Sequence, residues 1–160
     1  MEINKEDRLM GMDVYGNKPK SEKGDYFRNN VWWWRPLWNY CATSAPELID
    51  KETYVSGTYN DGKGLNAMKA AKLGVKLLTL IEDGSCATYK RERDLWLEAL
   101  EDDNCCVCNN NNRGHKKKEG CFACKGKGTK DNWHKSYPFD VKNVEEFAKF
   151  LIDSGGFEIW

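Results

Sequence analysis

The sequence predicts an α+β domain with about three main helices, a small sheet and an inserted zinc-knuckle loop. Apolar residues recur at helical spacing in the middle of the chain and again near its end. Between these regions, four cysteines form two C-x-x-C pairs. The chain has 160 residues, of which 40% are hydrophobic, so it can bury a core without disulfides or metals.

A sharp change of composition divides the chain into a core domain and an insertion. Residues 1–104 and 131–160 are predicted to form one α+β core domain, and residues 105–130 an inserted zinc-knuckle module. The insertion has almost no aliphatic residues, but it is rich in cysteine, glycine and lysine. It cannot build a hydrophobic core, so another interaction must fold it.

Early in the chain, a short apolar stretch at residues 12–15 precedes a polar loop and a cluster of tryptophans at positions 32, 33, 34 and 38. Three consecutive tryptophans cannot all point one way in a helix or a strand. We therefore expect one of them at a surface or cleft, where it could stack a nucleobase or anchor a partner. Burial of most of them in the core is the favoured alternative. This segment offers four residues for binding: Arg28, Trp32, Trp34 and Arg35.

Two helices and a loop are predicted next. Ser44 followed by Pro46 indicates the start of a short helix that ends before Tyr54, and residues 56–64 are typical of a loop. A helix with a broad apolar face follows over residues 65–81, although Gly74 inside it costs roughly 1 kcal/mol relative to alanine.

The remaining elements follow the same patterns. A second helix is predicted from about residue 88 to 102, with Trp96 among its candidate buried residues. Asn143, with Glu146 three residues later, resembles a capping box at the start of the last helix. The Ser-Gly-Gly sequence at 154–156 ends that helix, and a short strand is expected over 157–160.

The cysteine spacing predicts one structural zinc ion. Cys105 and Cys108 form one pair, and Cys121 and Cys124 form the other. Zinc(II) prefers four tetrahedral soft ligands, and four cysteines would leave no position for a catalytic water. The alternatives are a redox dithiol, buried free cysteines or a disulfide. Two further residues are alternative ligands, because one adjoins the first pair and the other lies in the connecting loop: Cys106 and His115.

Residues 121–128, Cys-Phe-Ala-Cys-Lys-Gly-Lys-Gly, resemble the C-x-x-C-x-G-x-G repeat of DnaJ-type chaperone zinc modules. The first pair departs from this repeat, because asparagines rather than glycines follow Cys108. Only two repeats are present, whereas the chaperone family uses four for two zinc ions. The resemblance implies a zinc knuckle and carries no chaperone activity.

The insertion is also strongly basic. It holds seven cationic residues against Glu119, a balance of 7 − 1 = +6, in a chain with 25 basic and 25 acidic residues. Such a loop could contact phosphates or an acidic protein face, and the alternative is a solvated surface. The residues predicted to bind are Arg113, Lys116, Lys117, Lys118, Lys125 and Lys127.

A second resemblance covers most of the chain. Met-Gly-Met-Asp-Val-Tyr-Gly-Asn-Lys-Pro at 10–19 and Tyr-Phe-Arg-Asn-Asn-Val-Trp-Trp-Trp-Arg-Pro-Leu at 26–37 resemble a family of small uncharacterised proteins of tailed phages and prophages. The aromatic last helix and Gly-Gly-Phe ending are similar as well. The resemblance implies a phage origin, the host cytoplasm and a role in host takeover or counter-defence. No functional residue carries over from it.

Motifs for catalysis are absent: the sequence contains no H-E-x-x-H, P-loop or G-x-S-x-G. We therefore expect a non-enzymatic zinc-binding protein that engages a host protein or a protein–nucleic-acid complex. One alternative is a binder of nucleotide-like ligands that uses Trp34 with Arg35, and another is a hydrolase or nuclease with an open carboxylate metal site. No membrane partner is expected, because the longest apolar stretch, residues 75–81, is too short to span a bilayer.

Overall fold

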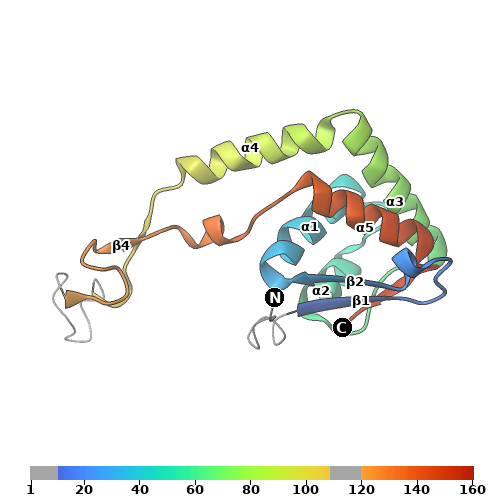
Figure 1. Ribbon diagram of the computed structural model, residues 1–160, viewed down its shortest axis with the longest axis horizontal. Helices are drawn as coiled ribbons and strands as arrows, with labels where there is room; N and C mark the ends of the chain where they lie inside the picture. Colours follow the sequence, from blue (N-terminus) through green and yellow to red (C-terminus); the bar gives the residue numbers. More distant parts are fainter. Residues whose placement is uncertain (1–10, 109–119) are drawn as a thin grey trace. The chain divides into compact units, whose positions relative to one another are not determined.

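The computed structural model describes residues 11–108 and 120–160 (Figure 1). The chain divides into two compact units, of which the first is formed by Met1–Arg91 with Tyr137–Trp160 and the second by Glu92–Ser136. The first unit holds the hydrophobic core, and the second holds the two cysteine pairs. The predicted insertion of residues 105–130 lies within the second unit, which extends past it on both sides.

The first unit contains a three-stranded antiparallel sheet in the order β2-β1-β5. Its strands are β1 (Gly11–Gly16), β2 (Tyr26–Asn30) and β5 (Phe157–Ile159). In the central strand, Val14 pairs with Phe27 on one side and with Ile159 on the other. Met12 and Val14 are buried while Tyr15 is exposed, the alternation of a sheet with one covered face. The strand predicted at the end of the chain is confirmed, over Phe157–Ile159.

Helix α1 (Val31–Ser44) contains the tryptophan cluster. Asn30 caps it, because its side-chain oxygen accepts hydrogen bonds of 3.1 Å from the backbone amides of Trp32 and Trp33. The prediction that Ser44 begins a helix is wrong, since Ser44 is the last residue of this one.

Helix α2 (Lys51–Tyr59) corrects two further predictions. It begins after Asp50, whose carboxylate accepts a 2.8 Å hydrogen bond from the Thr53 amide. It continues to Tyr59, so only residues 60–64 of the loop expected over 56–64 lie outside a helix. Gly57 is buried against α1, and a Cβ atom there would lie 2.6 Å from the Trp38 ring. Gly57, which favoured a loop in the sequence, therefore lies on the face of α2 that contacts α1.

Helices α3 (Ala67–Glu82) and α5 (Val141–Asp153) pack against each other, and both were predicted. The structure explains Gly74 of α3, which lowers helix propensity. A Cβ atom at this position would lie 2.7 Å from Ile152 Cγ1 and 2.8 Å from the Ala148 carbonyl oxygen. The glycine therefore allows the two helices to approach closely.

The start of α5 differs from the prediction. Asp140 occupies the N-cap position without a side-chain cap bond, and Asn143 lies inside the helix. The Asn143 side-chain oxygen instead accepts a 3.1 Å hydrogen bond from Asn29 of β2. The predicted stop is confirmed, because Gly155 and Gly156 adopt positive φ angles of 64° and 93° directly after the helix.

Helix α4 (Ser85–Ala99) begins and ends about three residues earlier than predicted. Its start is set by Asp83, whose carboxylate accepts a 2.8 Å hydrogen bond from the Ser85 amide. The boundary between the two units falls inside this helix. Trp96, predicted to be buried, is 45% exposed.

The α+β class is confirmed, with α1 and α2 in addition to the three main predicted helices in the part of the chain that the structure describes. None of the helices described is both long enough and apolar enough to cross a membrane.

Candidate metal centre

A short antiparallel ribbon brings the two cysteine pairs to one place. Its strands are β3 (Asp103–Asn104) and β4 (Thr129–Lys130). Cys105 follows β3 directly, and its amide donates a 2.9 Å hydrogen bond to the carbonyl of Gly128, just before β4. Because one C-x-x-C turn follows the first strand and the other precedes the second, both turns lie at the same end of the ribbon.

The four predicted cysteines form one cluster. The sulfur atoms of Cys105, Cys108, Cys121 and Cys124 all lie within 4.8 Å of one another. The Sγ atoms of Cys105 and Cys121 are 3.8 Å apart, and those of Cys108 and Cys124 are 3.6 Å apart. These distances exceed the S–S bond of about 2.05 Å, so the cysteines are not paired as disulfides. The cluster could hold one metal ion.

The two sulfur–sulfur distances of 3.8 and 3.6 Å are close to the edges of a tetrahedral zinc site. A Zn–S bond of about 2.3 Å implies sulfur atoms about 3.8 Å apart along each edge of the tetrahedron. Three of the four cysteines are buried, with Cys105 fully inaccessible, and the residues packed against them are Val107, Cys108 and Ala123. Among the described residues, the buried cluster at this site consists of the cysteines themselves, with only Val107 and Ala123 as apolar neighbours. A bound cation would therefore supply the stabilisation that a hydrocarbon core supplies elsewhere.

Hydrogen bonds from backbone amides lower the pKa values of two cysteines in the cluster. Hydrogen bonding from the Cys108 amide lowers the pKa of Cys105. Burial opposes ionisation of Cys124, but a 3.2 Å hydrogen bond from the Gly128 amide and the neighbouring thiols outweigh it and lower its pKa to about 6. Burial and the same thiol contacts raise the pKa of Cys108 to about 12. The protein alone thus favours thiolates at some of these positions, and a divalent cation would be needed to stabilise all four.

The second knuckle requires unusual backbone angles. Lys125, Gly126 and Gly128 have positive φ angles of 50°, 82° and 80°. Lys127 closes the turn with a 3.0 Å hydrogen bond from its amide to the Cys124 carbonyl. Glycine tolerates this region without a steric penalty, which accounts for the G-x-G spacing in the sequence.

The alternative ligands have different outcomes. Cys106 is exposed and does not belong to the cluster, so the structure does not support it as a ligand. Five of the predicted residues lie outside the described residues: Arg113, His115, Lys116, Lys117 and Lys118.

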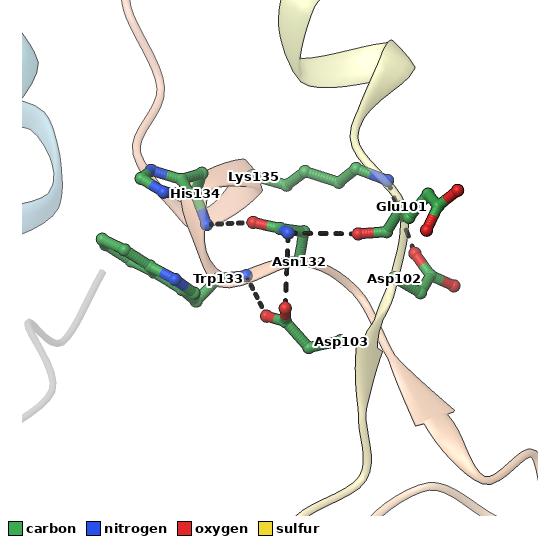
Figure 2. A network of polar contacts seen from close by, with 7 residues as sticks. All are labelled: Glu101, Asp102, Asp103, Asn132, Trp133, His134 and Lys135. Carbon is green, nitrogen blue, oxygen red and sulfur yellow. Dashed lines mark hydrogen bonds and ion pairs between the residues drawn. The ribbon is translucent and has the colours of Figure 1, made fainter.

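A polar network secures the base of the ribbon (Figure 2). The Asn132 side-chain amide donates to the Glu101 carbonyl at 3.1 Å and to the Asp103 carboxylate at 3.3 Å. The other carboxylate oxygen of Asp103 accepts a 3.0 Å hydrogen bond from the Trp133 amide. Lys135 forms an ion pair with Asp102 at 3.5 Å. The network joins the segment before β3 to the 3-10 helix η3 (Trp133–Ser136) after β4.

A cleft of about 630 Å³ opens beside the cysteine cluster. Cys124 lines it together with exposed residues, among them Lys125, Lys127, Lys130 and Trp133. Trp133 is 57% exposed, and its ring stacks on His134 with centroids 3.7 Å apart. Of these residues, the sequence predicted Lys125 and Lys127 for binding. Lys130 was counted among the seven cationic residues of the insertion, but Trp133 was not indicated, because it lies outside the insertion and only the β3–β4 ribbon brings it beside the knuckle.

The four binding residues predicted in the tryptophan segment lie in different surroundings. Trp34 is fully buried, so its prediction as a ligand-binding partner of Arg35 is wrong. Trp32 is 38% exposed and Arg35 is exposed, and both contact Tyr137 in the first unit. Arg28 forms an ion pair with Asp13 at 3.5 Å.

No protein-family model, curated protein or solved structure matches the chain. The interpretation of the cysteine cluster and its cleft therefore depends on their own geometry and chemistry.

Proposed function

We propose that this is a non-enzymatic zinc-binding protein that engages a host protein or a protein–nucleic-acid complex through the unit of residues 92–136. The observation that carries the proposal is the cleft, in which Cys124 lies beside Lys125, Lys127 and Trp133. A metal bound by the cysteines would hold the same knuckle that presents the lysines.

Zinc is the proposed metal, because four thiolates form a soft tetrahedral donor set. When bound, it would neutralise the thiolates and stabilise both turns. Four protein ligands fill its coordination sphere, so its role would be structural. The hydrolase alternative would need an open site of carboxylates. Within residues 11–108 and 120–160, the cysteine cluster is the one group able to hold a metal, so no observation favours that alternative.

The charges of the cleft suit an anionic partner. Three aspartates and three lysines line it, and the charge of one aspartate, Asp102, is neutralised within the unit by Lys135. Asp103 accepts hydrogen bonds from Asn132 and Trp133, which engage its oxygen atoms but leave its charge. The lysines beside the exposed indole of Trp133 combine phosphate-binding charge with a surface for stacking. This combination favours a partner that carries nucleic acid over one that is acidic protein alone.

The proposed setting is a phage protein that acts in host takeover or counter-defence in the host cytoplasm. Its support is the resemblance of residues 10–19 and 26–37 to a phage protein family. The exposed lysine-rich surface would then meet a component of the host.

Affinity purification from host extract tests the proposed function. The tagged wild-type protein is compared with a Lys125→Ala/Lys127→Ala double variant, with and without nuclease treatment of the extract. The matched control is Lys72→Ala/Lys76→Ala, which removes two exposed lysines from α3 in the other unit. We expect a partner that the wild type and the control retain, that the double variant loses, and that nuclease releases.

Two outcomes contradict the proposal. Retention of the same partners by the Lys125→Ala/Lys127→Ala variant would show that this cleft is not the contact surface. Absence of zinc from the purified protein would remove the structural basis of the module.

A further inference from the structure

The first unit contains a second cleft, of about 460 Å³, that the proposed function does not use. It lies where β1, the first turn of α1 and the end of α2 meet. Its principal lining residues are Met12, Trp32, Arg35, Tyr59, Asn60 and Tyr137. All of them belong to the unit of Met1–Arg91 with Tyr137–Trp160.

Aromatic rings form much of the wall of this cleft. Trp32 is 38% exposed and packs against Tyr137, with ring centroids 4.9 Å apart and planes at 57°. Tyr59 is 71% exposed. By contrast, Trp34, Trp38 and Tyr40 of α1 are buried in the core. Exposed rings that gather in one concave site are typical of binding sites for planar ligands.

Arg35 is the one charged residue among those described as lining the cleft. Its Nη1 atom donates a 3.1 Å hydrogen bond to the Tyr137 hydroxyl, and its guanidinium carbon lies 5.9 Å from the Tyr137 ring centroid. Among the described residues, no carboxylate forms an ion pair with it. A guanidinium has five N–H donors, so most remain available to an anion. The N-terminus of α1, which begins at Val31 in the cleft, adds a partial positive charge.

The part of the wall formed by α2 and β1 is held together at Asn60. Asn60 ends α2 in the left-handed conformation, with φ of 51°, which asparagine tolerates better than most residues. Its side-chain amide donates a 3.3 Å hydrogen bond to the Gly11 carbonyl of β1. This bond joins the end of α2 to the sheet beside the cleft. The cleft is therefore formed before any ligand binds, which reduces the entropic cost of binding.

We propose that this cleft binds a nucleoside monophosphate. The base would stack on Trp32 and Tyr59, and the phosphate would accept charge-assisted hydrogen bonds from Arg35. A volume of about 460 Å³ lies within the range of small-ligand sites. This site is independent of the cysteine cluster. It relocates the nucleotide-like site predicted from the sequence from Trp34 to Trp32.

Calorimetric titration with AMP, GMP, CMP and UMP, supported by thermal shift, tests the proposal. The four corresponding nucleosides and inorganic phosphate serve as partial probes. We expect at least one of the four nucleotides to bind and to raise the melting temperature. Its nucleoside should bind at least tenfold more weakly, because the contact with Arg35 is missing, and phosphate alone should not bind measurably.

Two variants locate the site. Arg35→Gln should weaken nucleotide binding about tenfold, the size of one charge-assisted hydrogen bond. Trp32→Leu should weaken it about tenfold or more through lost stacking. The controls are Arg91→Gln and Trp96→Leu, which change an exposed arginine and an exposed tryptophan outside both clefts and should bind as the wild type does.

Three results would overturn the proposal. They are no binding of any of the four nucleotides at millimolar concentration, binding of phosphate as tight as that of the nucleotides, or unchanged affinity in both Arg35→Gln and Trp32→Leu. None of these results bears on partner capture through Lys125 and Lys127, so the two proposals fail separately.

Discussion

The indole N–H of Trp34 donates a 2.8 Å hydrogen bond to the carbonyl of Gly57. That carbonyl belongs to the last turn of α2, where no backbone amide of the helix remains to donate a hydrogen bond to it. One turn further along α1, Trp38 stacks on Trp34 with centroids 5.4 Å apart and donates to the Tyr54 carbonyl at 3.0 Å. Helix α2 is thus attached to α1 through its backbone as well as through apolar contact.

Replacing Trp34 by phenylalanine tests this attachment. The variant keeps an aromatic ring but leaves the buried Gly57 carbonyl without its donor. We expect the free energy of unfolding to fall by about 1–3 kcal/mol, the cost of an unsatisfied buried polar group. Urea unfolding followed by far-UV circular dichroism measures it. Trp32→Phe, at an exposed position, should cost less than about 1 kcal/mol, and equal losses in both variants would contradict the assignment.

At Gly74, a substitution by alanine should change the stability in opposite directions through helix propensity and through packing. Gly74→Ala should raise the helix propensity of α3 by about 1 kcal/mol. The new Cβ atom would, however, meet Ile152 and the Ala148 carbonyl of α5 at less than 3 Å. We expect net destabilisation of about 1–3 kcal/mol from overpacking, measured by thermal and urea unfolding. Val75→Ala, on the exposed face of the same helix, should be close to neutral. A stabilised Gly74→Ala variant would refute the close packing of the two helices.

Metal analysis of the purified protein should give about one zinc ion per chain. Cys108→Ser removes one of four clustered thiols, so it should lower the bound zinc and the protection of residues 92–136 against proteolysis. The hydrophobic core of the first unit contains none of these ligands and should keep its protection.

Cys106→Ser is the matched control for that experiment. It changes the adjacent, exposed cysteine that stands outside the cluster. This variant should retain zinc and the protection of residues 92–136. Loss of zinc from Cys106→Ser together with its retention by Cys108→Ser would mean that the ligand set is wrong.

The cap of α2 predicts a pH effect. The hydrogen bond from the Thr53 amide lowers the pKa of Asp50 below its ordinary value. On acidification the unfolded chain therefore takes up this proton before the folded chain does. The stability that the Asp50 carboxylate contributes is complete above its ordinary pKa of about 3.9, and it is lost as the pH falls through the lower folded value.

Asp50→Asn keeps an oxygen for the cap but cannot titrate. The acid limb of its unfolding free energy should be flatter than that of the wild type below about pH 4. Unfolding in urea across pH 2.5–6 measures the slope. Glu47→Gln, an exposed change outside α2, should leave the wild-type slope unchanged, and an Asp50→Asn slope as steep as the wild type would exclude this role.

Local patterns predicted the elements whose residues interact with near neighbours in the chain. The helices around Leu73 and Phe147 show an apolar face at helical spacing, and Gly155 marks the end of one of them. The segment around Gly57 was predicted wrongly because its composition suits a loop. It becomes helical because α1 offers Trp34 and Trp38 as hydrogen-bond donors and packing surface, and these donors lie 23 and 16 residues from the carbonyl groups that they bond.

The fold class and the four-cysteine cluster could be predicted from the sequence, because helical apolar spacing and the C-x-x-C turns are local features. The sequence did not reveal which tryptophan faces a cleft, and the packing of α1 settles this point. Only the tertiary structure decided that Cys106 stands outside the cluster, and that Lys130 and Trp133 lie beside Cys124. The physical reason is that these arrangements depend on strand pairing and helix packing between distant segments, which no local pattern encodes.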